Sequence, residues 1–216
     1  MPSRSPLPPS PPPVEMRAWP DREALLRDRA AVLGELVKMF IGPARLGILW
    51  MWAGVAALGW ALVGAALLMF EDAYDALGVV PGVVCLAGGA AVTVPGLALL
   101  VVGVSRDLRV HRLLVEWGGL DRDPTEDARL RMPRVSLLWL LMSFALCAVG
   151  LFACVVVPAT ARAGEETYGL VTLLMGLGFL AWLTGLTGLV KAFAHRRWVL
   201  RVLVGVPADP LITVEG

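Results

Sequence analysis

Residues 77–104 read LGVVPGVVCLAGGAAVTVPGLALLVVGV, a stretch without a single ionisable side chain. A helix needs roughly 20 apolar residues to cross a bilayer core about 30 Å thick. Residues 46–70, 135–161 and 168–190 are equally free of Asp, Glu, Lys, Arg and His. Because only helices and closed barrels satisfy the backbone in lipid, unbroken apolar runs of this length indicate helices. The sequence therefore predicts an all-α integral membrane protein with four transmembrane helices.

The overall composition supports this fold class. Of the 216 residues, 57% are hydrophobic and 17% are charged, whereas soluble domains are about one quarter charged. A chain this apolar would expose more hydrophobic surface than a soluble monomer tolerates, which excludes an ordinary soluble enzyme. The net charge of +1 gives no reason to expect a nucleic-acid partner.

The distribution of positive charge predicts the sidedness of the chain. Seven of the 19 lysines and arginines lie in residues 1–45, seven in 105–134 and four in 191–216, which leaves only Arg162 in the short connections. Cationic loops stay on the cytoplasmic side of a membrane. Both termini and residues 105–134 are therefore expected in the cytoplasm. The chain has no Asn or Gln and is rich in Ala, Gly, Val, Leu and Arg, a bias that resembles a GC-rich bacterial genome, so the expected location is the bacterial inner membrane.

The four spans group into two helical hairpins, residues 46–104 and 135–190. Short matches relate them: Leu-Trp opens the first helix of each, at Leu49 and Leu138, and His-Arg-x-x-Val follows the second helix of each, at His111 and His195. Both hairpins start and finish on the same side, so the duplication would be a parallel tandem repeat.

Several cytoplasmic segments are expected outside the spans. Residues 1–20 form a proline-rich disordered leader, interpreted either as a solvated terminus or as an extended docking strip for an aromatic groove. Residues 21–45 form an amphipathic interfacial helix, and Arg29 falls off its apolar stripe. The stripe consists of Leu26, Ala30, Leu33, Val37 and Phe40.

Residues 105–134 form a loop with short helices, one of them capped by Asp123-Pro124-Thr125-Glu126. The acids of this loop, Asp127 among them, alternate with arginines as in a solvated charged segment. Residues 191–216 form a basic tail, for which a helix is preferred over a strand.

Small residues define the expected packing of the spans, because membrane helices associate closely at such positions. The predicted helix-packing seam consists of Gly82, Gly89, Gly96 and Gly103 in the second span and Ser143, Cys147, Gly150 and Cys154 in the third. The pattern indicates a tight four-helix bundle, and a homo-oligomer contact is the alternative interpretation.

The spans lack the ionisable residues that mark proton relays and ion sites. We expect no catalytic residues, no cofactor and no metal site, and we interpret His111 and His195 as solvated interfacial histidines. The residues that remain for a pathway, between the second and fourth spans, are Thr93, Pro95, Thr184 and Thr187.

The expected partners are membrane lipids together with a second copy of the chain or another membrane protein. Predicted contacts to lipid phosphates are Arg106, Arg109, Arg112, Arg196, Arg197 and Arg201. The predicted function is that of a non-catalytic multi-pass scaffold or adaptor, acting through helix packing and cytoplasmic partner contacts. The alternative is a small channel or transporter subunit.

Overall fold

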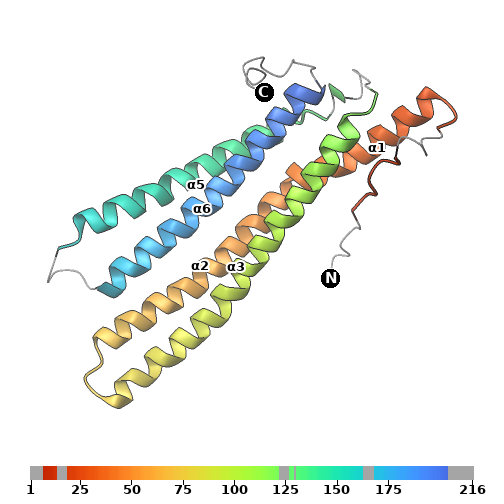
Figure 1. The fold of residues 1–216 in the computed structure, drawn as a ribbon. Helices are drawn as coiled ribbons and strands as arrows, with labels where there is room; N and C mark the ends of the chain where they lie inside the picture. Colours follow the sequence, from red (N-terminus) through yellow and green to blue (C-terminus); the bar gives the residue numbers. More distant parts are fainter. Residues whose placement is uncertain (1–6, 14–18, 122–126, 129, 163–167, 204–216) are drawn as a thin grey trace, which may run out of the picture. The chain divides into compact units, whose positions relative to one another are not determined.

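A computed structural model of the chain describes residues 7–13, 19–121, 127–128, 130–162 and 168–203 (Figure 1). These residues form helices and contain no strand. The helices are α1 (Arg22–Ile41), α2 (Pro43–Glu71), α3 (Ala76–Gly118), α5 (Pro133–Thr160), α6 (Tyr168–Trp198) and the π-helix η2 (Val199–Leu203). Four of the helical segments are long and apolar enough to cross a membrane, which confirms the predicted fold class at that level. The predicted cap at Asp123–Glu126 lies outside the described residues.

Local sequence explains where α1 begins and ends. The Asp21 carboxylate accepts a hydrogen bond from the Ala24 amide at 2.7 Å and caps the N-terminus. Gly42 ends the helix, and its amide donates to the Lys38 carbonyl at 3.0 Å. Pro43 then begins α2, a first-turn position where the missing amide costs nothing. The break between α1 and α2 is therefore set by the Gly42-Pro43 pair.

The chain folds as two compact units. Unit 1 contains residues 1–45, 105–138 and 191–216, and unit 2 contains residues 46–104 and 139–190. The long helices α3 and α6 contribute residues to both.

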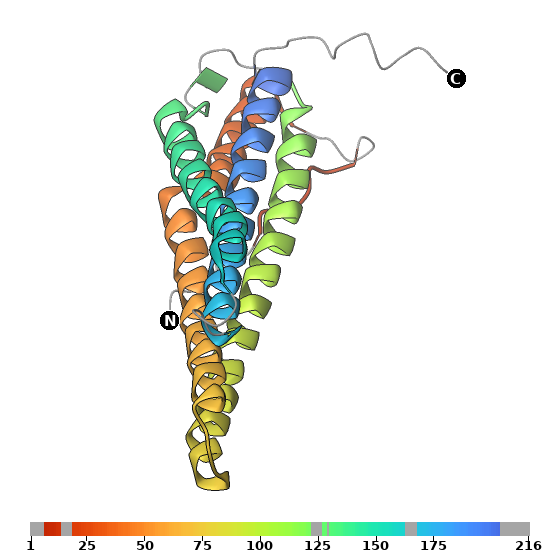
Figure 2. The ribbon, with the colours of Figure 1, turned by 90° about the vertical axis from the view of Figure 1, so that its left-hand side faces the viewer.

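In unit 2, α2 and α3 lie side by side (Figures 1 and 2) and contact one another through glycine. A Cβ atom on Gly89 would lie 2.8 Å from both the Gly59 carbonyl oxygen and the Val63 amide nitrogen, and one on Gly96 would lie 3.0 Å from the Ala56 amide nitrogen. The two backbones therefore approach closely because no side chain stands between them.

The other residues of the predicted seam lie in different surroundings. Gly82 lies against the Phe70 ring, and a Cβ atom on Gly103 would meet nothing within 4 Å. On α5, Gly150 faces the Gly178 carbonyl of α6, and Gly185 and Gly188 of α6 face Cys147 and Ser143. The Cys154 thiol lies 3.7 Å from the Met175 carbonyl oxygen.

Two polar contacts join α2 to α6 within unit 2. The Trp60 indole N–H donates to the Leu173 carbonyl at 3.2 Å, and the ring lies against Gly176. The Glu71 carboxylate accepts from the Gly169 amide at 2.8 Å. This amide belongs to the first turn of α6, where backbone N–H groups lack helical partners and the helix dipole favours an anion.

Substitution of neighbouring glycines tests the α2–α3 contact. Gly89→Ala should lower the free energy of unfolding by roughly 1–3 kcal/mol, because the new methyl meets backbone atoms that cannot move aside. Gly88→Ala is the matched control, since its Cβ atom would meet nothing within 4 Å. Equal, small changes in the unfolding midpoint in mixed detergent micelles would show that α3 does not pack on α2 at this point.

Candidate functional site

Unit 1 has an apolar core of its own. Buried residues of α1, α3 and α6 meet there, and the Trp198 indole N–H donates to the Leu114 carbonyl at 3.0 Å. The buried apolar side chains are Leu33, Leu36, Val37, Phe40, Ile41, Val110, Leu114, Trp117, Ala192 and Trp198. Much of the apolar face of α1 is therefore covered by the chain itself.

A buried ion pair corrects two sequence expectations in unit 1. Arg29 is 1% exposed, although the stripe on α1 places it on the solvent side, and Asp127 is also 1% exposed rather than solvated. The Arg29 guanidinium contacts the Asp127 carboxylate through two hydrogen bonds, of 2.7 Å and 3.3 Å. Two-point pairing of this kind fixes orientation as well as distance. It attaches the segment around Asp127 to α1.

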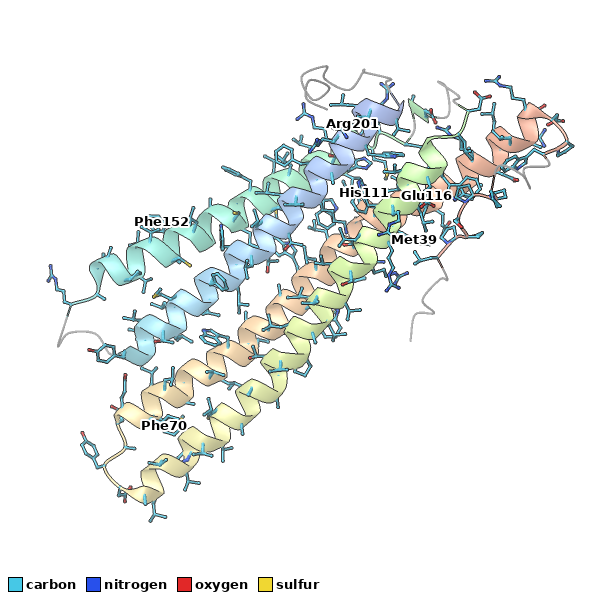
Figure 3. The ribbon with its side chains drawn as sticks, in the orientation of Figure 1. Met39, Phe70, His111, Glu116, Phe152 and Arg201 are labelled. Carbon is cyan, nitrogen blue, oxygen red and sulfur yellow. The ribbon has the colours of Figure 1, made fainter. Side chains whose placement is uncertain are left out.

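A second buried group, which we call the Lys191 cluster, consists of Phe40, Asp107, His111, Lys191 and His195. The Lys191 ammonium donates to the Asp107 carboxylate at 2.6 Å and lies 5.2 Å from the centre of the Phe40 ring. The imidazole of His111, which is labelled in Figure 3, stacks on the Phe40 ring, with 5.4 Å between the two ring centres. The cluster therefore joins α1, α3 and α6.

His195 is the most enclosed titratable group of the Lys191 cluster. It is 1% exposed, so the expectation of a solvated interfacial histidine is wrong for this residue. Its Nε2 atom lies 3.4 Å from the Arg131 carbonyl oxygen. Burial lowers the pKa of His195. The hydrogen bond with the Arg131 carbonyl raises this pKa, and the nearby His111 lowers it, but both effects are smaller than that of burial. Burial also lowers the pKa of His111.

These groups set what the Lys191 cluster can do chemically. The pKa values of both imidazoles lie below their ordinary value, and burial also lowers the pKa of Lys191, against the raising effect of Asp107. Asp107 Oδ1, His111 Nδ1 and His195 Nδ1 are buried without a hydrogen-bond partner among the described residues. Within that same part of the chain, no three carboxylate, imidazole or thiol groups are arranged to hold a metal ion. The cluster is therefore able to take up protons but is not arranged as a metal centre.

The six arginines predicted to contact lipid phosphates differ in their exposure. Arg109 and Arg112 on α3, Arg196 and Arg197 on α6, and Arg201 in η2 are exposed. Arg106 is half-buried and has an interaction of its own. Five of the six side chains are thus accessible to an anionic ligand.

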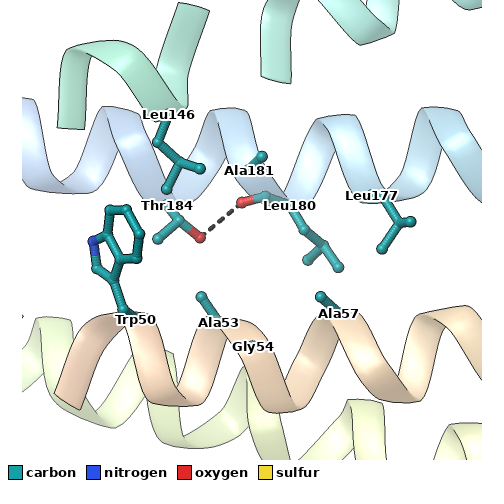
Figure 4. Close-up of a pocket in the computed structure, with 9 residues that line it drawn as sticks. All are labelled: Trp50, Ala53, Gly54, Ala57, Leu146, Leu177, Leu180, Ala181 and Thr184. Atoms are coloured by element: carbon teal, nitrogen blue, oxygen red, sulfur yellow. Dashed lines mark hydrogen bonds between the residues drawn. The ribbon is translucent and has the colours of Figure 1, made fainter. Parts of the chain in front are cut away.

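Unit 2 contains a cavity of about 210 Å³ between α2, α5 and α6 (Figure 4). Its one hydroxyl, on Thr184, donates to the Leu180 carbonyl of the same helix at 2.7 Å, so the lining offers no free hydroxyl hydrogen. The lining residues are Trp50, Ala53, Gly54, Ala57, Leu146, Leu177, Leu180, Ala181 and Thr184. The cavity suits an apolar occupant better than a hydrated ion.

The candidate pathway residues lie at different helix contacts. Thr93 lies at the α2–α3 contact, and its hydroxyl donates to the Gly89 carbonyl at 2.8 Å. The Thr187 hydroxyl donates to the Leu183 carbonyl at 2.8 Å, and Pro95 lies inside the continuous helix α3. Only Thr184 lines the cavity.

Comparison of the chain with protein-family models, with curated proteins and with solved structures finds no match. Function is therefore argued from geometry. The sequence contained one signal for the buried ion pairs: Asp107 and Lys191 each stand four residues before the histidine of the two His-Arg copies. Residues four apart share a helix face, so opposite charges at matching positions of the two His-Arg motifs were a signal for a pair. Nothing comparable identified Arg29 and Asp127.

Lowering the pH should destabilise unit 1 through its histidines. A histidine whose pKa is lower in the folded than in the unfolded state contributes full stability above the unfolded value of about 6.5 and loses it as the pH falls toward the folded value. Thermal unfolding midpoints between pH 8 and pH 5 should therefore fall more steeply for the wild type than for His195→Gln. Identical slopes would contradict the buried, neutral state of His195.

Breaking the Arg29–Asp127 pair should be costly. Arg29→Met leaves a buried carboxylate without its cation and should reduce the free energy of unfolding by roughly 3–5 kcal/mol. Arg27→Ala is the matched control, because the side chains of the Arg27–Glu23 pair on the same helix are 72% and 75% exposed, and exposed pairs contribute little to stability. Urea unfolding followed by tryptophan fluorescence measures both. A small effect of Arg29→Met would show that the pair is solvated.

Proposed function

We propose that the chain is a multi-pass protein of the bacterial inner membrane that acts without catalysis, as a scaffold or adaptor. In this proposal the apolar segments of unit 2 cross the bilayer as two hairpins. Unit 1 lies in the cytoplasm and is the surface that meets a partner, which is either another membrane protein or a second copy of the chain.

The observation that carries this proposal is the internal organisation of unit 1. Loops that merely connect spans need no core, yet α1 and the ends of α3 and α6 share buried apolar residues and two buried ion pairs. Burying paired charges costs desolvation energy and is better suited to fixing one arrangement than to adding stability. A rigid cytoplasmic unit attached to four spans is what a scaffold needs.

The contacts of unit 1 also support a parallel tandem repeat. Asp107 pairs with Lys191, and the Leu114 carbonyl accepts from Trp198. In both contacts the two partners stand 84 positions apart, as do His111 and His195. Direct contact between equivalent positions is typical of two copies related by a two-fold axis.

Lipid binding fits the same arrangement. A cation close to an anionic leaflet contributes about 1 kcal/mol, and the exposed arginines of α3, α6 and η2 follow the apolar segments directly in sequence. We propose that they hold lipid phosphates at the cytoplasmic surface.

Reporter fusions test the topology. Fusions after Asp72 and Ala161 should report the outer side of the membrane, and fusions after Leu120 and Gly216 the cytoplasm, because positive charge is retained where the chain is made. Alkaline phosphatase and green fluorescent protein activities measured in parallel give the two signals. One fusion on the opposite side to its predicted one would overturn the topology.

Site-specific photo-crosslinking in intact membranes tests the adaptor function. A crosslinking amino acid at exposed Glu35 of α1 should give a discrete adduct with a partner protein or a second copy. The same amino acid at Leu58, which is an exposed apolar position of unit 2, should give lipid adducts. Absence of protein adducts from Glu35, Arg109 and Arg196 alike, in folded protein, would contradict the adaptor function.

Reconstitution separates this proposal from the channel alternative. The adaptor predicts that purified protein in liposomes carries no ion flux above that of empty vesicles. Ion flux would instead establish the channel alternative if Gly89→Leu abolishes it and Gly88→Ala leaves it unchanged.

A further inference from the structure

The leader of the chain contacts the core of unit 1 at one defined point. Residues 7–13 read LPPSPPP and lie beside the end of α3 (Figure 1). The Trp117 indole N–H donates to the Pro9 carbonyl at 3.0 Å. Trp117 is only 5% exposed, so its ring is held in the core while its one donor is used by the leader.

The chemistry of this segment suits such a contact. Proline fixes φ near −65° and has no amide hydrogen, and a proline-rich stretch adopts the extended polyproline II conformation with three residues per turn and no internal hydrogen bonds. Its carbonyl oxygens have no partner within the helix, so they can accept hydrogen bonds from neighbouring donors. Because the conformation exists before binding, little chain entropy is lost on docking.

Two of the half-buried residues of the leader, Pro8 and Pro11, lie on the same edge of such a helix. Leu7, Pro8, Pro11 and Pro12 are half-buried, whereas Pro9, Ser10 and Pro13 are exposed. Pro8 and Pro11 are three residues apart and so fall on the same edge, in the spacing of a Pro-x-x-Pro ligand. Grooves that bind polyproline segments also present aromatic side chains, and here Trp117 supplies the hydrogen-bond donor.

We infer that the surface of unit 1 around Trp117 is a binding site for polyproline II peptides and that the chain's own residues 7–13 occupy it. Because the leader is tethered to α1 by a few residues, its effective concentration at the site is in the millimolar range. A free peptide must compete with this internal ligand. Release of the leader exposes a Pro-x-x-Pro strip and a vacant site together. This inference goes beyond the adaptor function and stands whether or not unit 1 binds a partner protein.

The test uses the full chain in nanodiscs with ¹⁵N-labelled tryptophan. Trp117→Phe identifies the Trp117 indole resonance by its disappearance. Pro8→Ala/Pro11→Ala should shift this resonance, because the leader loses its preformed conformation and leaves the site. Pro13→Ala is the matched control, since Pro13 is an exposed proline of the same segment, and it should leave the resonance in place.

A peptide of residues 7–13 with a fluorescent label is the probe for the vacant site. It should bind Pro8→Ala/Pro11→Ala about tenfold or more tightly than the wild type, because the internal competitor is gone. Addition of Trp117→Phe to that variant should abolish the difference. The two leader substitutions lie outside the core, so folding does not confound them. An unchanged Trp117 resonance in the double variant, or equal peptide affinity for the double variant and the wild type, would overturn the inference.

Discussion

The exclusion of charge from four apolar stretches is the constraint on which the rest of the structure depends. An ionisable side chain at the centre of a bilayer costs several kcal/mol, and residues 46–70, 77–104, 135–161 and 168–190 contain none. Nearly all of the lysines and arginines therefore fall in residues 1–45, 105–134 and 191–216. Where the described parts of those segments fold on one another, in unit 1, two enclosed cations are each paired with a carboxylate. Arg29 with Asp127 and Lys191 with Asp107 are the two buried solutions.

The sequence predicted the helices and their apolar character well, because long uncharged runs and periodic glycines are local patterns. It placed Gly89, Gly96 and Gly150 on a packing seam, and the structure places these residues against backbone atoms of a neighbouring helix. It also preferred a helix over a strand after residue 190, and α6 with η2 continues to Leu203.

The sequence did not predict the interior of unit 1. The apolar stripe of α1 assigns Arg29 to solvent because periodicity describes one helix at a time and contains no information about a partner 98 positions away. His195 was expected to be solvated because it stands next to Arg196 and Arg197 after an apolar span, which also says nothing about the helices that cover it. Gly103 is an error in the other direction, because the sequence predicted a packing contact that the structure does not have. It continues the seven-residue period of glycines, yet a Cβ atom at this position would meet nothing within 4 Å. Tertiary contacts, rather than propensity, decide all three.

The two units are thus held together by different kinds of contact. In unit 2, backbone approach at glycine and hydrogen bonds such as Trp60 to Leu173 hold the helices together, which is how helices associate where lipid provides no hydrophobic drive between them. In unit 1, an apolar core encloses paired charges and a buried histidine. The proposed scaffold function depends on unit 1 being as rigid as unit 2.

Hydrogen–deuterium exchange of the full chain in nanodiscs, read by mass spectrometry, tests this most directly. If the core of unit 1 and its Arg29–Asp127 pair hold α1, its amides are protected in the wild type and exchange rapidly in Arg29→Met, while the helices of unit 2 exchange slowly in both. Rapid exchange of α1 in the wild type, or unchanged protection of α1 in Arg29→Met, would contradict it.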